Sequence, residues 1–361
     1  MSEIDRRRFL VNLAKLGVSA IAVRIAQTEA VNFSENEQIL LEAAHRRRNK
    51  PFFVATYPGF DERGEKVWDR IAHFQKAVPR LYAIGDFADF TTLCSSARGV
   101  YERRAWKLWE EYGLYYILSI GGGFVFDGHP YKHNSFGFWE EVFEKISENA
   151  NFPRGTFFRP FFEGNIQSDA FDYTLSDEID YRQHAESHLR LQLAAYRAFR
   201  PKGIRIINSL WGPDYLRRWG FEDYIARLSG DDEGFFNGLD AYNYNPGLVG
   251  IKNPRDFLTY LEYGNQSPEQ LLLMPLAEFE SAGTSFGISE ISTRHPKSGE
   301  FAYISGLCAL ATRASFIIWF DVDATYKQEL GAYQEGDFTA DDEVLLALDE
   351  ISRIARPFRQ F

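Results

Sequence analysis

The chain has 361 residues, of which 45% are hydrophobic, enough to bury the core of one large α/β domain. Its formal net charge of −11 repels a phosphate backbone, which argues against nucleic acid as a partner. The two cysteines, Cys94 and Cys308, are too few for a disulfide framework and lie in no metal-binding spacing.

The first thirty residues differ from the rest of the chain. The run Asp5-Arg6-Arg7-Arg8-Phe9-Leu10, followed by the mostly apolar residues 11–23, resembles a twin-arginine export signal. The apolar run is too short to serve as a stable membrane anchor. We therefore expect residues 1–30 to be an export signal and the protein to be periplasmic or extracellular. The alternative is an amphipathic N-terminal helix that packs on the domain formed by residues 31–361.

Beyond residue 30, apolar runs of strand type alternate with longer amphipathic segments, a pattern that predicts parallel βα units. The eight expected strands are 51–57, 80–87, 114–120, 156–163, 204–211, 239–243, 286–291 and 315–321. The expected helices include 65–77, 98–112, 138–149, 177–200 and 299–313. Eight strands in a chain of this length favour a closed (β/α)8 TIM barrel, in a single domain, over an open doubly wound sheet.

The glycine pattern also argues against an open nucleotide-binding sheet, which carries a glycine fingerprint after its first strand. Here the first expected strand runs into Tyr57-Pro58-Gly59-Phe60 instead. The run Gly121-Gly122-Gly123 after the third strand lacks the surrounding pattern of a phosphate-binding loop. We therefore expect the protein to act without a cofactor.

Two carboxylates lie at the ends of expected strands. Glu163 ends the fourth strand, and Glu290 lies near the end of the seventh. Because the carboxyl ends of barrel strands open into one mouth, both side chains are expected to face the same cleft. Glycosidic cleavage requires such a pair, because one carboxyl group protonates the leaving oxygen while the other attacks or supports the anomeric carbon.

The surroundings of the two carboxylates predict different pKa values. Glu163 follows a phenylalanine-rich run, and apolar surroundings raise the pKa of a carboxyl group towards the range of a general acid. A guanidinium such as Arg159 would lower the pKa of Glu290 and keep it ionised. The sequence therefore predicts an acid at position 163 and an anion at position 290.

At these positions the sequence resembles the retaining glycoside hydrolases of clan A, and most of all family 26, which includes β-mannanases. The matching motifs are Arg159-Pro160 before Glu163, Asn165 after it, Gly287-Ile288-Ser289-Glu290, and Ile318-Trp319-Phe320 on the last strand. The resemblance implies that Glu163 is the general acid/base and Glu290 the nucleophile of a double displacement.

The resemblance also implies positions for three neighbours of these carboxylates. Arg159 would lie beneath the site near the nucleophile, Tyr242 would reach towards Glu290, and Trp319 would form the floor under the bound sugar. The chain departs from the family at Phe162, where the mannanases have histidine. Mannan specificity therefore does not carry over, and Asn165 is the candidate for the missing sugar contact.

Further substrate contacts are expected from residues at strand ends. Aromatic rings can stack on pyranose faces, and the candidates are Tyr57, Phe124 and Trp211. Asp86 closes the second strand, where a carboxylate could accept hydrogen bonds from sugar hydroxyls. His129, in the loop after the third strand, is a further candidate contact. The expected substrate is a β-linked polysaccharide or oligosaccharide such as mannan, glucan, xylan or an exopolysaccharide, while the oligomeric state stays open.

Two alternatives use the same barrel. A non-catalytic carbohydrate-binding barrel would explain the loss of histidine at position 162. A metal-dependent hydrolase would use His129 and His133. His184 and His188 also have metal-ligand spacing, but the HExxH motif is absent and a solvated helix face is the better interpretation. The leading hypothesis is a metal-free retaining endo-β-glycosidase.

Overall fold

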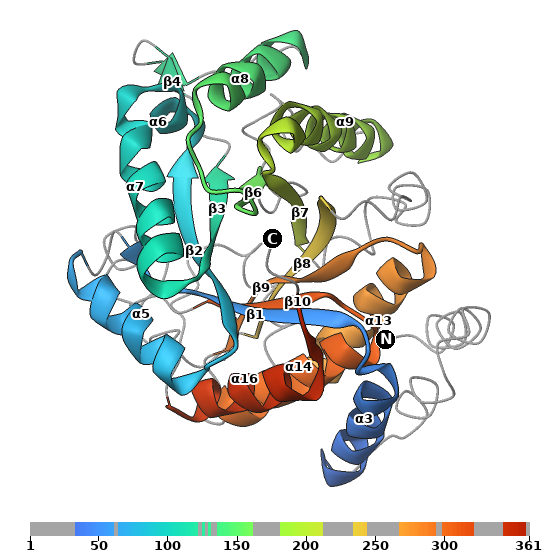
Figure 1. Cartoon of the computed structure of the whole chain (residues 1–361). Helices are drawn as coiled ribbons and strands as arrows, with labels where there is room; N and C mark the ends of the chain where they lie inside the picture. Colours follow the sequence, from blue (N-terminus) through green and yellow to red (C-terminus); the bar gives the residue numbers. More distant parts are fainter. Residues whose placement is uncertain are drawn as a thin grey trace, which may run out of the picture.

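The computed structural model describes residues 33–60, 64–121, 125–126, 129–130, 136–161, 181–211, 234–243, 267–293, 298–320 and 342–358. Eight parallel strands follow one another in chain order around a barrel, which closes because the last pairs with the first (Figure 1). They are β1 (Pro51–Tyr57), β2 (Leu81–Asp89), β3 (Tyr115–Gly121), β6 (Phe157–Pro160), β7 (Arg205–Trp211), β8 (Phe235–Asn243), β9 (Phe286–Thr293) and β10 (Phe316–Phe320). The predicted (β/α)8 TIM barrel is confirmed.

Helices surround the strands as an outer layer (Figure 1). Among the described residues, the helices that follow the strands are α5 (Lys66–Ala77), α6 (Phe90–Cys94), α7 (Gly99–Lys107), α8 (Phe136–Asn149), α9 (Tyr181–Phe199), α13 (Pro268–Ser281), α14 (Ser298–Ala311) and α16 (Asp342–Ile354). A further helix, α3 (Phe33–Arg47), precedes β1 and packs against α14. None of the helices that the structure describes is long and apolar enough to cross a membrane.

Four of these helices, α3, α6, α13 and α16, were not among those expected from the sequence. In α13 the consecutive residues Leu271, Leu272 and Leu273 are all buried, and such a run of adjacent apolar residues obscures the helical period. Pro275 inside the same helix is a further signal against helix in a sequence. A helix that is buried on several sides therefore lacks the amphipathic sequence pattern by which helices are predicted.

Short elements complete the described chain. After β3, the two-residue strands β4 (Val125–Phe126) and β5 (His129–Pro130) pair in antiparallel fashion. A π-helical turn, η2 (Leu108–Tyr112), extends α7, and a 3-10 turn, η4 (Arg200–Lys202), extends α9. The two-residue strand β11 (Arg356–Pro357) adds to the start of β1.

Alternation along the strands divides the core into two layers. Side chains at every second position fill the barrel interior, and those between them pack against the helices. On β10, Phe316, Ile318 and Phe320 belong to the interior layer, whereas Ile317 and Trp319 belong to the outer one. A residue's place in this alternation therefore decides whether it can take part in a site inside the barrel.

The end of the barrel at which the strands begin is closed by aromatic rings. Phe53 on β1 and Tyr82 on β2 both contact Phe358 from the C-terminal segment, with ring centroids 5.2 and 5.4 Å apart. Phe157 and Phe316 pack on Phe53 in the same layer. This end is a packed floor, so a site inside the barrel opens at the other end.

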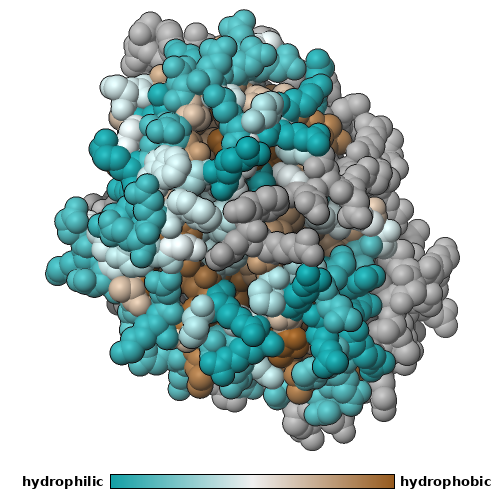
Figure 2. Space-filling view, in the orientation of Figure 1, coloured by the Kyte–Doolittle hydropathy of each residue, from teal (hydrophilic) through white to brown (hydrophobic). Residues whose placement is uncertain are grey.

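On the face shown in Figure 2, the surface of the described residues is largely hydrophilic. Among the residues with a described environment, the exposed large hydrophobic side chains are Val100, Leu193 and Leu346. They lie on three different helices, α7, α9 and α16. Single apolar residues scattered in this way are normal for a folded domain and do not indicate a binding patch.

Gly85 on β2 gives a test of packing inside the barrel. A Cβ at this position would lie 2.1 Å from two ring atoms of Tyr57, so Gly85→Ala should lower the free energy of unfolding by about 1–3 kcal/mol. Gly99→Ala is the control, because its Cβ would meet only the flexible guanidinium of Arg103, at 3.3 Å. Thermal unfolding of both variants measures the effect, and equal stability of the two would contradict the packing described here.

Candidate active site

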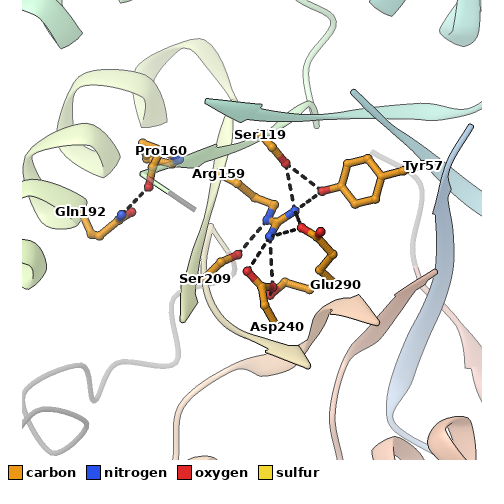
Figure 3. A network of polar contacts seen from close by, with 9 residues as sticks. Tyr57, Ser119, Arg159, Pro160, Gln192, Ser209, Asp240 and Glu290 are labelled. Atoms are coloured by element: carbon orange, nitrogen blue, oxygen red, sulfur yellow. Dashed lines mark hydrogen bonds and ion pairs between the residues drawn. The ribbon is translucent and has the colours of Figure 1, made fainter. Parts of the chain in front are cut away.

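Arg159, a buried arginine, organises the barrel interior near the carboxyl ends of the strands. Arg159 on β6 is fully buried and points into the barrel (Figure 3). Its Nε donates to Ser209 Oγ at 2.7 Å, and its Nη1 donates to Ser119 Oγ at 2.9 Å and to the hydroxyl of Tyr57. Its Nη2 donates to both carboxylate oxygens of Asp240, at 3.0 and 2.9 Å. The guanidinium is thereby held in one orientation.

The same guanidinium contacts Glu290. Both Nη1 and Nη2 of Arg159 lie 3.1 Å from Oε2 of Glu290. The arrangement therefore joins one cation to two carboxylates, Asp240 and Glu290, inside the barrel. The structure places Arg159 beside Glu290, the arrangement that the family resemblance implied.

The register of the parallel strands explains why these residues meet. Arg159 on β6 pairs in register with Ser119 on β3, and Asp240 on β8 pairs with Glu290 on β9. Residues paired in register on neighbouring strands stand at the same height and on the same face. The polar groups of the cluster thus form one layer across the barrel, near the carboxyl ends of the strands.

A β-bulge in β9 turns Glu290 inward. Leu239 pairs with Ile288 and Asp240 with Glu290, so one residue, Ser289, is extra in β9. As a result Ser289 and Glu290 both face the barrel interior, and Ser289 Oγ donates to Asp240 Oδ1 at 2.5 Å. Gly238 makes room for this serine, because a Cβ there would lie 2.2 Å from Ser289 Oγ.

Burial and charge determine the ionisation of the cluster. Burial opposes the charge on Arg159, but the neighbouring carboxylates, Asp240 above all, raise its pKa above the ordinary value, and it stays a cation. Burial raises the pKa of Asp240, while Arg159 and Ser289 favour its ionised form. Asp240 is fully buried and Glu290 is 5% exposed, so Glu290 is the carboxylate nearer to the solvent in the mouth.

Tyr57 takes part in the cluster through its hydroxyl and not through its ring. The side chain is 1% exposed, and its ring is stacked on that of Phe87 with centroids 5.0 Å apart. The hydroxyl also shares a hydrogen bond of 2.8 Å with Ser119 Oγ, and burial raises the pKa of Tyr57. The expectation that this ring stacks on a sugar is therefore corrected: Tyr57 is a buried partner of Arg159.

Asp86 lies on the opposite side of the barrel wall from the cluster. Its neighbour Phe87 faces the interior, so alternation turns Asp86 outward, where it is 4% exposed. The carboxylate accepts hydrogen bonds from Arg104 Nη1 at 2.8 Å, from the Tyr116 hydroxyl at 2.5 Å and from its neighbour's backbone N–H. The expected contact with sugar hydroxyls is corrected, because this carboxylate binds the outer layer of the protein.

Trp319 also faces the outer layer. It is fully buried on β10 among side chains that pack against the helices, between the inward-facing Ile318 and Phe320. The expectation of a tryptophan floor under the sugar does not fit this position. Phe320, which contacts the rings of Tyr57 and Phe87 in the barrel interior, is the aromatic residue of this strand nearest to the Arg159 cluster.

The other predicted contacts fall wholly or partly outside the described residues. Glu163, Asn165 and Phe124 lie outside them, so their roles stay predictions. Trp211 ends β7, Tyr242 lies in β8 and His129 begins β5, and only the backbone of each is described.

The interpretation of His188 as part of a solvated helix face is wrong. His188 is fully buried, and its Nε2 shares a hydrogen bond of 2.9 Å with Asn208 Oδ1 on β7. The face of α9 that packs on the barrel carries this histidine, and a polar strand residue binds its Nε2. No group of His, Cys, Asp or Glu side chains within the described ranges could hold a metal ion.

Sequence reasoning missed Asp240 and the serines that surround it. Asp240 is the one acid in β8, a buried strand. This was the available signal, because a buried carboxylate requires a partner. The serines at positions 119, 209 and 289 carried no such signal, since serine is common in strands and turns alike. Their shared role appears only where the strands meet around the guanidinium.

Comparison with known proteins finds similarity in fold. No family model and no curated protein matches the sequence. A family 5 xyloglucanase from Paenibacillus pabuli is 12% identical with a TM-score of 0.52, over 85% of this chain and 99% of that one. A glucosidase from Croceicoccus marinus is 13% identical with a TM-score of 0.50, over 85% and 68%. A ruminal GH26 endo-beta-1,4-mannanase is 13% identical with a TM-score of 0.47, over 90% and 67%.

Replacing Arg159 by methionine tests the electrostatic role of the cluster. The change leaves the buried carboxylate of Asp240 without its cation, so Arg159→Met should lower the free energy of unfolding by about 3–5 kcal/mol. The double variant Arg159→Met, Asp240→Asn should recover part of this loss, because the uncompensated charge is gone. Urea unfolding measures both.

The control is Arg46→Met, which breaks an exposed pair with Glu42 one turn away on α3. Such pairs contribute about 1 kcal/mol or less. A loss at Arg159 no larger than this would contradict the structural role of the cluster.

The raised pKa of Asp86 predicts that stability depends on pH. Burial raises its pKa from the ordinary 3.8 to about 6, so the folded state binds the proton more tightly than the unfolded chain in this interval. The wild type should therefore lose stability relative to Asp86→Asn as pH rises from 4 to 7, by roughly 3 kcal/mol in all. Thermal unfolding of both proteins across this range measures the difference, and a constant or growing advantage of the wild type would contradict it.

Proposed function

We propose that the chain is a retaining glycoside hydrolase that cleaves internal bonds of a β-linked polysaccharide by double displacement. Glu290 is the nucleophile and Glu163 the general acid/base. The observation that carries the proposal is the contact of Glu290 with Arg159 in the layer of polar groups near the strand ends. The fold shared with a xyloglucanase and a glucosidase is compatible with this function.

The environment of Glu290 suits a nucleophile. Two hydrogen bonds from Arg159 to the same oxygen favour the ionised carboxylate and fix its orientation. Asp240 accepts from Nη2 through both oxygens and Ser209 accepts from Nε, so the guanidinium is held beside Glu290. A nucleophile held in this way loses little freedom when it attacks, which is a main source of rate enhancement.

The position of Glu163 in the sequence suits the acid/base. Arg159, four residues earlier, already contacts the proposed nucleophile, so the chain leaves β6 beside Glu290. Retaining hydrolysis needs the two carboxyl groups roughly 5–5.5 Å apart on either side of the anomeric carbon. We propose that Glu163, three residues beyond the end of β6, meets this requirement.

The proposed reaction has two steps. In the first, Glu163 protonates the glycosidic oxygen while Glu290 attacks the anomeric carbon, which breaks the glycosidic bond and forms a glycosyl ester on Glu290. In the second, Glu163 removes a proton from water, which attacks the same carbon and releases Glu290. The product keeps the β configuration, and neither step requires a cofactor.

The predicted export signal fits a protein that acts on a polysaccharide outside the cytoplasm. Residues 1–30 lie outside the described part of the chain, so the proposal of export rests on the arginine motif and the apolar run alone. Mass determination of the protein recovered from an expressing bacterium would show whether this segment is removed.

Glu290→Ala tests the proposed function. Incubated with mannan, β-glucan and xylan, the wild type should release oligosaccharides from at least one of them, and proton NMR should show the β anomer first. Glu290→Ala should reduce the rate by about 10⁴-fold or more while the substrate still binds, since the covalent step is lost.

Ser292→Ala is the matched control, because this serine lies on the same strand two residues further along. Wild-type activity in Glu290→Ala, or initial release of the α anomer, would reject the double displacement. Binding of a glycan without any product, even by the wild type, would instead favour the non-catalytic carbohydrate-binding barrel.

A further inference from the structure

The fourth barrel strand ends in an unusual backbone conformation. Phe161 follows the last residue of β6 and has a φ of 53°. This left-handed conformation is rare for a bulky side chain, because the Cβ crowds the backbone. The sequence pattern predicted that the strand would run on to residue 163, whereas Phe161 ends it at Pro160. The turn occurs two residues before the proposed acid/base.

Aromatic packing holds this turn in place. The Phe161 side chain is fully buried, with its ring centroid 4.7 Å from that of Trp139 on α8 and 4.8 Å from that of Phe90 on α6. Its backbone N–H donates to the carbonyl of Ile120 on β3 at 2.9 Å. The ring contacts and the backbone hydrogen bond thus together hold Phe161 in its left-handed backbone conformation.

A glutamine from the outer layer holds the residue before the turn. Gln192 on α9 is fully buried, and its Nε2 donates to the carbonyl of Pro160 at 2.5 Å (Figure 3). Proline has no backbone N–H, so the carbonyl is the polar group through which this residue can be held. A carbonyl only accepts hydrogen bonds, which determines that the amide nitrogen of Gln192 faces it.

The contact holds the strand end on the side where the sheet does not. The pairing of β6 with β7 ends at Phe158, so Pro160 lies beyond the last residue that β7 holds. The hydrogen bond from Gln192 ties this end of the strand to α9 instead. On the other side, β3 still pairs with Pro160 through Ile120. Two buried contacts from the outer helices, one polar and one aromatic, add to this pairing where the chain leaves β6.

We propose that Gln192 and Phe161 are positioning residues for the general acid/base, holding the end of β6 so that Glu163 is placed for proton transfer. The inference rests on the proposed function and adds two residues to it. Strained backbone is retained where the surrounding structure holds it, and it is concentrated at functional sites. Proton transfer depends steeply on placement, so release of this strand end should impair the acid and leave the nucleophile intact.

The reactivity of aryl glycosides separates these two effects. The probes are the 2,4-dinitrophenyl and phenyl β-glycosides of cellobiose and of mannobiose, compared by kcat/KM, which reports bond cleavage. Dinitrophenolate leaves without protonation, whereas phenolate needs the acid. Gln192→Met keeps the volume and removes the donor, so it should lose at least about tenfold on the phenyl glycoside and less than about twofold on the dinitrophenyl glycoside.

Two further variants complete the comparison. Phe161→Leu, which loses the aromatic contacts and keeps an apolar side chain, should show the same selective loss and serves if Gln192→Met does not fold. Gln75→Met is the matched control, because Gln75 Nε2 donates to the carbonyl of Tyr112 at 2.6 Å, away from the strand end. It should leave both substrates unaffected.

Glu163→Ala distinguishes failure of the inference from failure of the proposed function. It should lose about 10²–10⁴-fold on the phenyl glycoside and little on the dinitrophenyl glycoside. If it does so and both positioning variants lose activity equally on the two substrates, or on neither, the positioning role is rejected. If Glu163→Ala itself shows no selectivity for the leaving group, the assignment of the acid/base is rejected.

Discussion

The burial of one guanidinium group is the constraint on which the carboxyl-terminal half of this barrel depends. A cation taken out of water is strongly unfavourable unless carboxylates and further hydrogen-bond acceptors surround it. Arg159 obtains these partners from the strands around it: Asp240 and Glu290 supply the charge, and Ser119, Ser209 and Tyr57 complete the hydrogen bonds. The strands must therefore meet in one register, and the same requirement orients Glu290.

The two ends of the barrel differ in chemistry because they serve different purposes. At the closed end, rings from several strands pack with Phe358 and supply apolar burial without polar groups to satisfy. At the other end, the interior layer is polar and charged around Arg159. A rigid, apolar floor beneath a charged layer can hold carboxylates in place for chemistry at the mouth, which is the usual division of labour in such barrels.

Several energetically unfavourable features lie close to the same strand ends. The buried charges around Arg159, the bulge at Ser289 and the left-handed Phe161 all occur where β6, β8 and β9 approach the mouth. Each is held by well-packed surroundings, such as the aromatic rings on either side of Phe161. Concentration of strain and of buried charge in one place is what pre-organisation of a catalytic site requires.

The sequence by itself determined the architecture and part of the site. Apolar runs separated by amphipathic segments sufficed for the eight strands and their closure, since both are consequences of local periodicity and chain length. Glu290 could be singled out because a carboxylate near the end of a barrel strand is expected in the mouth. Arg159 was placed near it by the family resemblance. Asp240 was not found, since a partner is defined by a contact and not by a pattern.

Only the tertiary structure decided which side of each strand faces inward. In a strand, neighbouring side chains point to opposite sides, but the sequence does not show which side is the interior. Asp86 and Trp319 were therefore placed in the mouth, although both face the helices. The bulge in β9 then moves the alternation by one residue and turns Glu290 into the barrel beside Ser289. Such a shift arises from pairing between strands distant in the chain, which no local pattern contains.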